Sequence, residues 1–417
     1  MEKSKIRFKG YQEDWEQRKL GDLVNRVTRK NQDLVSELPL TISAQYGLID
    51  QNEFFDKRVA SKDVSGYYLI ENGEFAYNKS TSTDAPWGAI KRLDRYENGV
   101  LSTLYIVFGI KENNPVDSDF LVSYYNTNLW HKGIHEIAAE GARNHGLLNI
   151  APADFFETKL MIPQDIEEQK KIGKYFEELE RLITLHQRKC EEMKTLKKYM
   201  LQKMFPQNGQ SVPQIRFSGF TEDWEQRKLS ELATMHARIG WQNLRTSEFL
   251  DAGDYMLITG TDFEDGKVNY STCHYVEKER YDQDKNIQIK NGNILITKDG
   301  TLGKVAYVEG LSLPATLNAG VFNVEVKDEN ETDSKYLFQF LKAPFLMDYV
   351  SKKATGGTIK HLNQTILVDF PIATPSRAEQ VRIGEYFSTL DDLITLHQQK
   401  CDELRNIKKF MLQNMFI

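Results

Sequence analysis

The chain has 417 residues, 40% hydrophobic and 27% charged, which is ordinary for a globular protein and excludes a disordered tail. No apolar run approaches the ~20 residues of a membrane span, and the N-terminus lacks the apolar stretch of a signal peptide. We therefore expect a cytoplasmic protein with no membrane contact. The net charge of −6 excludes a generally basic nucleic-acid-binding protein, although local basic patches can still bind phosphate.

Cysteine usage excludes two further classes. Cys190, Cys273 and Cys401 are too few for a disulfide framework, and none lies in a CxxC pair with zinc-ligand spacing. We expect reduced, structural thiols and no metal site.

Two stretches of the chain occur twice, in the same order. Residues 6–23 return as 215–232, and residues 168–205 return, mostly identical, as 379–416. Such self-similarity dictates the architecture, and a tandem pair folds naturally with approximate two-fold symmetry. The regions between the repeated stretches align only in scattered places. Repeated stretches that enclose two different regions, called the inserts below, favour two recognition domains that bind different targets.

The first copy begins with residues 6–23, which, like residues 215–232 of the second copy, are called the leading segment below. We expect Trp15 of this segment to pack against the repeated helices. Its insert then shows a strand at 74–77 and a loop at 79–87. An aromatic-rich helix opens at Ser118, and a glycine-containing loop follows at 140–146. The pattern predicts a mixed α/β region in which strands dominate.

The second copy keeps this outline. Trp224 takes the place of Trp15, and residues 292–308 read as strand, tight glycine turn and strand. Ser334 opens the counterpart helix, and a glycine-rich loop follows at 354–361. Such loops suit close approach to a polyanion, but they are also common surface turns. Their recurrence at matching places favours binding.

Each copy ends in a long helix that follows Pro163 or Pro375. A seven-residue spacing of apolar positions predicts that the two helices form an antiparallel coiled coil, each about 57 Å long at ~1.5 Å per residue. The histidines of this seam are expected to set register rather than bind metal, and Cys190 and Cys401 to fill small apolar gaps. The seam positions are Ile172, Leu179, His186, Met193 and Met200 in the first helix, and Ile383, Leu390, His397, Leu404 and Met411 in the second.

The apolar stripe of each helix is wider than a two-helix seam requires. Tyr175, Phe176 and Ile183 lie beside the first seam, with matching residues beside the second. Two interpretations stay open: the surplus packs against the protein's own globular domains, or it takes a partner protein.

The fold class that follows is mixed α/β, with two tandem globular domains separated by two long helices in a pseudo-two-fold arrangement. The predicted boundaries are 1–165 for the first domain, 166–206 for the central helix, 207–214 for a linker, 215–376 for the second domain and 377–417 for the C-terminal helix.

Motifs of catalysis are missing from the sequence. There is no GxGxxG loop, Gly303-Lys304 lacks the rest of a phosphate-binding motif, and no GxSxG, HExxH or PCxxC occurs. The only Asn-Pro pair, Asn114-Pro115, does not continue as in DNA amino-methyltransferases. We expect a chain that is not an enzyme and holds no cofactor of its own.

The sequence resembles the specificity subunits of type I restriction-modification systems. The resemblance is carried by Trp-Glu-x-x-Lys-Leu at 15–20 and 224–229, by the Pro-to-Glu-Gln segments at 163–169 and 375–380, and by the duplicated order over essentially the full chain. The first copy departs from the pattern, because it lacks the compact Lys-Asp-Gly turn of the second.

The resemblance implies a non-catalytic subunit with two target recognition domains, each reading one half of a bipartite, asymmetric site on double-stranded DNA. The coiled coil would set the spacing and dock two methyltransferase (modification) subunits. S-adenosylmethionine would bind those subunits, and ATP and magnesium would bind restriction subunits, if present. An alternative interpretation is an adaptor whose globular units bind proteins.

Base readout requires basic, amide and hydroxyl side chains at groove edges. We expect these on the loops that recur in both copies, although lysines there can also simply solvate turn ends. In the first copy the candidates are Gln45, Tyr46, Lys79, Ser80, Thr81, Thr83, Arg143, Asn144 and His145. In the second they are Trp241, Gln242, Arg245, Lys298, Thr301, Lys304, Lys360, His361 and Asn363.

Overall fold

The computed structural model divides the chain into two compact units. Unit 1 comprises Met1–Gln187 and Gln399–Ile417, and unit 2 comprises Arg188–Gln398. None of the helices in the described part of the chain combines the length and the apolar character needed to cross a membrane. The structure describes residues 4–43, 46–83, 85–112, 116–138, 146–207, 210–240, 243–353 and 361–417.

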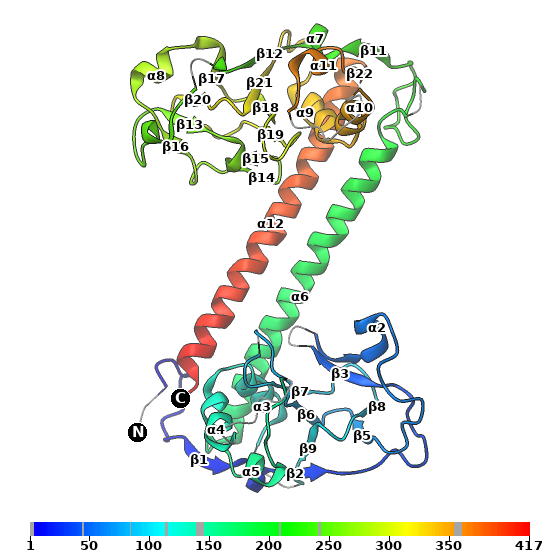
Figure 1. Ribbon diagram of the computed structural model, residues 1–417, viewed down its shortest axis with the longest axis vertical. Helices are drawn as coiled ribbons and strands as arrows, with labels where there is room; N and C mark the ends of the chain where they lie inside the picture. Colours follow the sequence, from blue (N-terminus) through cyan, green and yellow to red (C-terminus); the bar gives the residue numbers. More distant parts are fainter. Residues whose placement is uncertain are drawn as a thin grey trace. The chain divides into compact units, whose positions relative to one another are not determined.

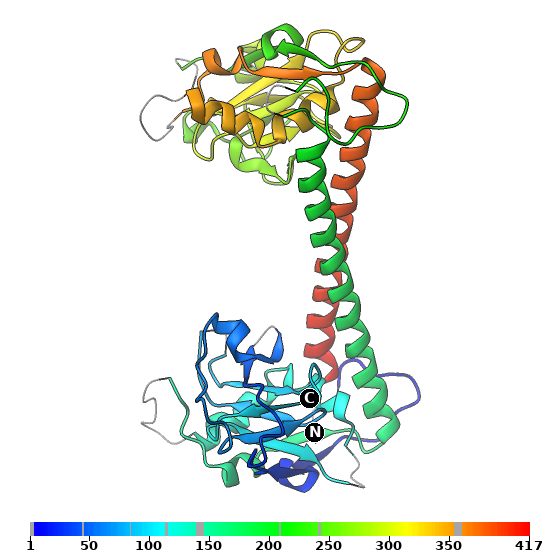
Figure 2. The ribbon, with the colours of Figure 1, turned by 90° about the vertical axis from the view of Figure 1, so that its right-hand side faces the viewer.

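Two long helices, α6 (Ile166–Lys203) and α12 (Arg377–Met415), pack together and contribute to both units (Figures 1 and 2). In unit 1, Lys408 of α12 forms an ion pair with Glu180 of α6. In unit 2, Lys197 Nζ of α6 lies 2.6 Å from Asp391 Oδ1 of α12. Because residue numbers rise along one helix as they fall along the other, the pair is antiparallel, as predicted.

The leading segment of each copy forms a short strand and one helical turn. The strand pairs, in antiparallel register, with the strand just before the long helix, so that Glu16 lies opposite Ile162 in unit 1 and Glu225 opposite Thr374 in unit 2. These elements form a frame common to both units. They are β1 (Glu16–Lys19), α1 (Leu20–Leu23) and β10 (Lys159–Ile162) in unit 1, and β11 (Glu225–Lys228), α7 (Leu229–Leu232) and β22 (Pro371–Thr374) in unit 2.

The insert of unit 1 is built from short strands and short helices. The strands are β2 (Val24–Val27), β3 (Leu40–Ser43), β4 (Gly47–Asp50), β5 (Tyr68–Glu71), β6 (Phe75–Asn78), β7 (Ala89–Arg92), β8 (Asn98–Leu101) and β9 (Ile106–Ile110). The helices are α2 (Gln51–Phe55), α3 (Ser118–Tyr125), α4 (Leu129–Ile137) and α5 (Pro152–Phe156). The main sheet has the order β2-β9-β6-β7, and β3-β4 and β5-β8 form separate pairs. The predicted strand at 74–77 is β6.

The insert of unit 2 has larger sheets. Its strands are β12 (Ala233–Ala237), β13 (Met256–Ile258), β14 (Phe263–Glu264), β15 (Lys267–Val268), β16 (His274–Tyr275), β17 (Gln288–Ile289), β18 (Ile294–Thr297), β19 (Val305–Tyr307), β20 (Ala315–Leu317) and β21 (Val321–Val326). Its helical turns are η2 (Thr246–Glu248), η3 (Gly260–Asp262), α8 (Lys278–Asp282), η4 (Lys285–Ile287), α9 (Ser334–Lys342), α10 (Phe345–Lys353) and α11 (Gln364–Leu367). A sheet of order β12-β21-β18-β19-β15-β14 lies beside one of order β16-β13-β20-β17. The predicted strand, turn and strand are β18 and β19, which pair antiparallel.

The helices α3 and α9 begin where the sequence predicts, but the serines do not cap them. The capping side chains belong to the preceding residues, Asp117 and Asp333, which accept hydrogen bonds from Phe120 N at 2.9 Å and Tyr336 N at 2.8 Å. Aspartate is as good a cap as serine, and its charge also favours the helix N-terminus.

The cores of both units include the repeated tryptophans. Trp15 makes edge-to-face contacts with Phe120 and with Phe416, which follows α12. Trp224 contacts Phe205, which follows α6, in the same way. The tryptophans therefore pack at the ends of the long helices, as expected.

Candidate nucleic-acid interface

A bidentate ion pair joins the leading segment to the first turn of the long helix in each unit. The Arg7 guanidinium donates to both carboxylate oxygens of Glu168, at 2.5 and 2.7 Å, and Arg216 donates to Glu379 at 2.7 and 2.8 Å. Both carboxylates are buried, and the hydrogen bond to Glu168 raises the pKa of Arg7. The geometry is that of strong, charge-assisted pairing.

The residue after each buried glutamate links the long helix to the insert. Gln169 Oε1 accepts a hydrogen bond from the backbone N of Asp117 at 2.8 Å, and Gln380 Oε1 accepts one from Asp333 N at 2.9 Å. Since these aspartates cap α3 and α9, each glutamine fixes the start of an insert helix.

A helical glycine allows the closest approach in each unit. A Cβ on Gly173 would lie 2.7 Å from the backbone N of Phe120, and one on Gly384 would lie 2.9 Å from Tyr336 N. Only glycine leaves room for the backbones to approach this closely. Both inserts therefore contact the long helix through the same two positions, the glutamine and the glycine, while the glutamate holds the leading segment.

In unit 1 the structure brings together two of the predicted loops. Leu148 N donates to Lys79 O at 3.0 Å, and Thr81 N donates to Gly146 O at 2.7 Å. Burial lowers the pKa of Lys79, which is half-buried, while Ser80 and Thr83 are exposed.

The other candidates of unit 1 are not part of this pairing. Tyr46 is exposed in the turn between β3 and β4. Gln45, Arg143, Asn144 and His145 lie outside the described residues.

Unit 2 repeats the loop pairing. Leu362 N donates to Lys298 O at 2.9 Å, the counterpart of the Leu148–Lys79 bond, and His361 Nδ1 lies 2.5 Å from Asp299 Oδ1. Sequence reasoning missed Asp299, although its place in the Lys-Asp-Gly turn beside Lys298 was the available signal.

The remaining candidates of unit 2 differ in their surroundings. Thr301 and Lys304 are exposed in the turn between β18 and β19. Asn363 uses its side-chain oxygen to cap α11 by accepting from Thr365 N. Arg245 is exposed and precedes η2, on a separate segment. Trp241, Gln242 and Lys360 lie outside the described residues.

The predicted seam positions differ in burial. Ile172, Leu179, Ile383 and Leu390 are buried in the two cores. The partly buried positions are Met193, Met200, Leu404, Met411, His186 and His397. Cys190 and Cys401 are buried and free of disulfides. Phe176 and Ile183 are buried as well, so the surplus stripe packs into the protein's own core at these points.

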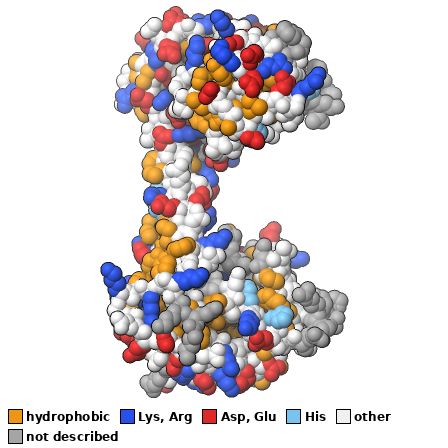
Figure 3. Space-filling model, turned by 90° about the vertical axis from the view of Figure 1, so that its left-hand side faces the viewer, with side chains coloured by type: hydrophobic (Ala, Val, Ile, Leu, Met, Phe, Trp, Pro, Cys, Tyr) orange, Lys and Arg blue, Asp and Glu red, His pale blue; other side chains and the backbone are white. Residues whose placement is uncertain are grey.

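The long helices also expose apolar side chains at matching positions. Leu196 and Tyr199 on α6 are 37% and 50% exposed, and the repeat places Ile407 and Phe410 of α12, 38% and 56% exposed, at the equivalent positions. Figure 3 shows hydrophobic side chains gathered on the helix surface next to unit 1. Both pairs together are called the twin apolar patches below.

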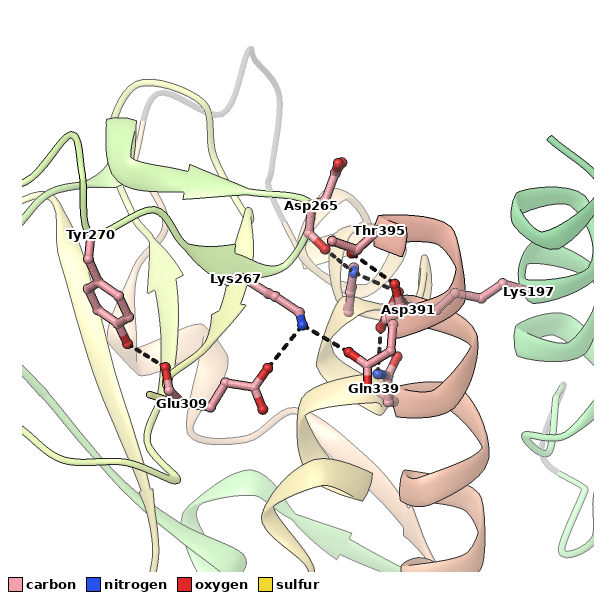
Figure 4. Close-up of polar contacts among 10 residues, drawn as sticks. Lys197, Asp265, Lys267, Tyr270, Glu309, Gln339, Asp391 and Thr395 are labelled. Atoms are coloured by element: carbon pink, nitrogen blue, oxygen red, sulfur yellow. Dashed lines mark hydrogen bonds and ion pairs between the residues drawn. The ribbon is translucent and has the colours of Figure 1, made fainter. Parts of the chain in front are cut away.

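An ionic cluster joins the insert of unit 2 to α12 (Figure 4). Asp391 pairs with Lys197 at 2.6 Å and Lys342 at 3.6 Å, and it accepts from Gln339 Nε2 at 3.0 Å. Burial, together with the charge of Lys342, lowers the pKa of Lys197 to about 8. Burial works to raise the pKa of Asp391, but the two lysines outweigh it and the pKa is lowered.

A second ionic link lies beside this cluster. Lys267 Nζ lies 3.0 Å from Asp392 Oδ1 and 3.1 Å from Glu309 Oε1. Within the described ranges, no group of three or more His, Cys, Asp or Glu side chains could hold a metal ion.

Comparison with known proteins agrees with this architecture. The sequence model of a family described as "Type I restriction modification DNA specificity domain" matches residues 12–195 and 221–406. The MjaVIII specificity subunit of a type I restriction enzyme from Methanocaldococcus jannaschii is 23% identical over 407 residues, covering 95% of this chain and 91% of the relative. The putative MjaX specificity subunit of the same organism is 22% identical, with the same coverage.

A solved structure shares the fold. The crystal structure of the S subunit of a type I restriction-modification system from M. genitalium superposes with a TM-score of 0.64 at 14% identity, covering 100% of this chain and 99% of that one.

Proposed function

Because the chain belongs to the family of type I restriction-modification DNA specificity proteins, as the non-catalytic specificity subunit of such a system, we propose that each unit reads one half of a bipartite, asymmetric target on double-stranded DNA. The observation that carries this proposal is the identical frame with unlike inserts. The same ion pair, glutamine link and helical glycine recur in both units, whereas the insert has a four-stranded main sheet in unit 1 and a six-stranded sheet in unit 2. Two inserts with different surfaces, each held by an equivalent frame, suit a DNA target whose two half-sites differ in sequence.

We place base readout on the paired loops. The segments around Lys79–Thr81 and Gly146 in unit 1, and around Lys298–Lys304 and His361 in unit 2, present lysine, hydroxyl and imidazole groups on turns held by equivalent backbone hydrogen bonds. Such side chains suit base edges and phosphates. We include the other candidate residues of the sequence analysis in the proposed interface. We also propose domain boundaries at 165/166, 206/207, 214/215 and 376/377.

We assign the twin apolar patches to two copies of one partner, the modification subunit. A repeat that presents the same exposed pair twice offers two equivalent sites, so two identical partners fit it. S-adenosylmethionine would bind those partners, and ATP and magnesium a restriction subunit, in a cytoplasmic complex. The α6–α12 pair would fix the distance between the half-sites.

The test is to express the chain with its modification subunit and map methylated adenines across a genome by single-molecule sequencing. A single split, asymmetric motif supports the proposal. A stable complex without any methylation motif contradicts it and favours the adaptor interpretation, in which the globular units bind proteins.

A further inference from the structure

A groove of about 1000 Å³ lies within unit 1, between the long helices and the loops of the insert. Glu180 of α6 and Arg405 and Lys409 of α12 line its helical side. Arg95, from the loop after β7, and Tyr46, from the turn between β3 and β4, line the opposite side. The groove is therefore shared by both helices and by two separate loops of the insert.

The charge of the groove is positive. The single carboxylate among its lining residues, Glu180, is already paired with Lys408. Arg405 has only an exposed pairing with Asp402 at 3.3 Å, of the kind that contributes little. Among the residues that the structure describes, Arg95 and Lys409 form no hydrogen bond or ion pair. Two exposed cations from different elements thus face one hollow without a counter-charge.

The equivalent place in unit 2 is neutralised by the protein itself. The repeat makes Asp391 the counterpart of Glu180, and Asp391 is covered by Lys342 and Gln339 of α9. The next residue, Asp392, is held by Lys267. When α3 and α9 are aligned at their capping aspartates, Asp117 and Asp333, the residue of unit 1 that corresponds to Lys342 is the uncharged Asn126. Asn126 lines the groove. Asn126 therefore leaves open in unit 1 a place that Lys342 and Gln339 of α9 cover in unit 2.

The groove and the apolar patch of α12 lie on different faces of that helix. Successive residues of an α-helix turn by about 100°, so Ile407 and Phe410 point away from Arg405 and Lys408, which lie two positions before them. A partner seated on the apolar patch would leave the groove accessible.

We propose that this groove binds the phosphate backbone of the DNA duplex next to the half-site read by unit 1, with Arg95 and Lys409 as the phosphate contacts. The inference rests on the proposed function. A duplex is the polyanion that the protein already serves, and its phosphates need basic and amide groups without any base readout. The contacts would add affinity and position the duplex, but they would carry no sequence information.

The test measures equilibrium binding of the full chain, purified with its modification subunit, to a fluorescent duplex that carries the mapped motif and to a scrambled duplex, across a salt series. The variant Arg95→Gln/Lys409→Gln is compared with Lys159→Gln/Lys174→Gln, which removes the same charge from exposed positions of unit 1 that do not line the groove. Each phosphate contact contributes roughly 0.9 to the slope of log K against log salt.

We expect the groove variant to lower the slope by about two and the affinity on the order of tenfold at 0.15 M salt, equally on both duplexes, while the methylated motif stays the same. The control variant, Lys159→Gln/Lys174→Gln, should change neither the slope nor the affinity. An unchanged slope in the groove variant overturns the proposal, and so does loss of the modification subunit from the purified complex, which would assign the groove to a protein. Failure of the wild type to prefer the motif would contradict the proposed function instead, because the groove is expected to bind scrambled DNA as well.

Discussion

The carboxylate of Glu168 receives two hydrogen bonds from the Arg7 guanidinium, at 2.5 and 2.7 Å, and its side chain has no exposed surface. The residues are 161 positions apart in the chain, so the pair fastens the leading segment to the start of α6. Arg216 and Glu379 repeat the arrangement.

Arg7→Met should lower the free energy of unfolding by about 3–5 kcal/mol, because it leaves a buried charge without a partner. Urea denaturation followed by tryptophan fluorescence measures this loss. Arg18→Met is the matched control, since Arg18 pairs with Glu16 on the surface and should lose less than about 1 kcal/mol. Equal losses in the two variants would contradict the structural role of the buried pair.

The helical glycines provide a second test of the frame. Gly173→Ala would place a Cβ 2.6–2.7 Å from atoms of Asp119 and Phe120, and we expect a loss of about 1–3 kcal/mol. Gly133→Ala, in helix α4, meets only Thr158 at 3.5 Å, so its helix propensity should make it neutral or stabilising by up to about 1 kcal/mol. Thermal unfolding of both variants measures the difference in stability between them. A Gly173→Ala protein as stable as Gly133→Ala would count against the close approach.

Much of the frame could be predicted from the sequence, because repetition fixes which positions are equivalent. The long helices, their antiparallel pairing and the packing of Trp15 and Trp224 followed from that pattern. The caps did not, because Asp117 precedes a serine that is itself a good cap, whereas in the structure Asp117 accepts from Phe120 N and the Ser118 hydroxyl accepts from Arg92.

The candidate interface was less predictable. The equivalence of Lys79 and Lys298 could be read from the loops, and the backbone carbonyl of each accepts the equivalent hydrogen bond, from Leu148 N and Leu362 N. The groove beside Arg95 could not, because its sides come from segments far apart in the chain. The exposed pairs at Leu196 and Ile407 were hidden in an apolar stripe whose other members, such as Phe176, are buried. Periodicity shows that a face is apolar but not what covers it.

The ionic cluster of unit 2 makes stability depend on pH. The pKa of Lys197 is lowered to about 8 from 10.5, so between these values the unfolded chain binds more protons than the folded one. The stabilisation from this group is therefore full above pH 10.5 and is lost as the pH falls through 8. The wild type should gain about 2–3 kcal/mol relative to Lys197→Met between pH 7.5 and 10. Parallel stability curves for the two proteins would argue against this titration.

The twin apolar patches should each hold one partner. Ile407→Asp/Phe410→Asp, or Leu196→Asp/Tyr199→Asp, should reduce the bound modification subunits from two to one, because a charge in an apolar contact is left without a partner. Native mass spectrometry of the purified complex counts the subunits. Leu313→Asp, at another exposed apolar position, is the control and should leave two. Two bound subunits in both patch variants would place the docking surface elsewhere.

The most direct test of whether the two units recognise their half-sites independently is to give both units the same insert. Residues 24–158 of unit 1 would replace residues 233–370 of unit 2, with the frame strands and both long helices unchanged. Adenine methylation would then be mapped across a genome by single-molecule sequencing. Two equal readers on a two-fold frame should recognise an inverted repeat, so we predict a symmetric motif in which the half-site of unit 1 appears twice. Continued methylation of the original asymmetric motif would contradict the account.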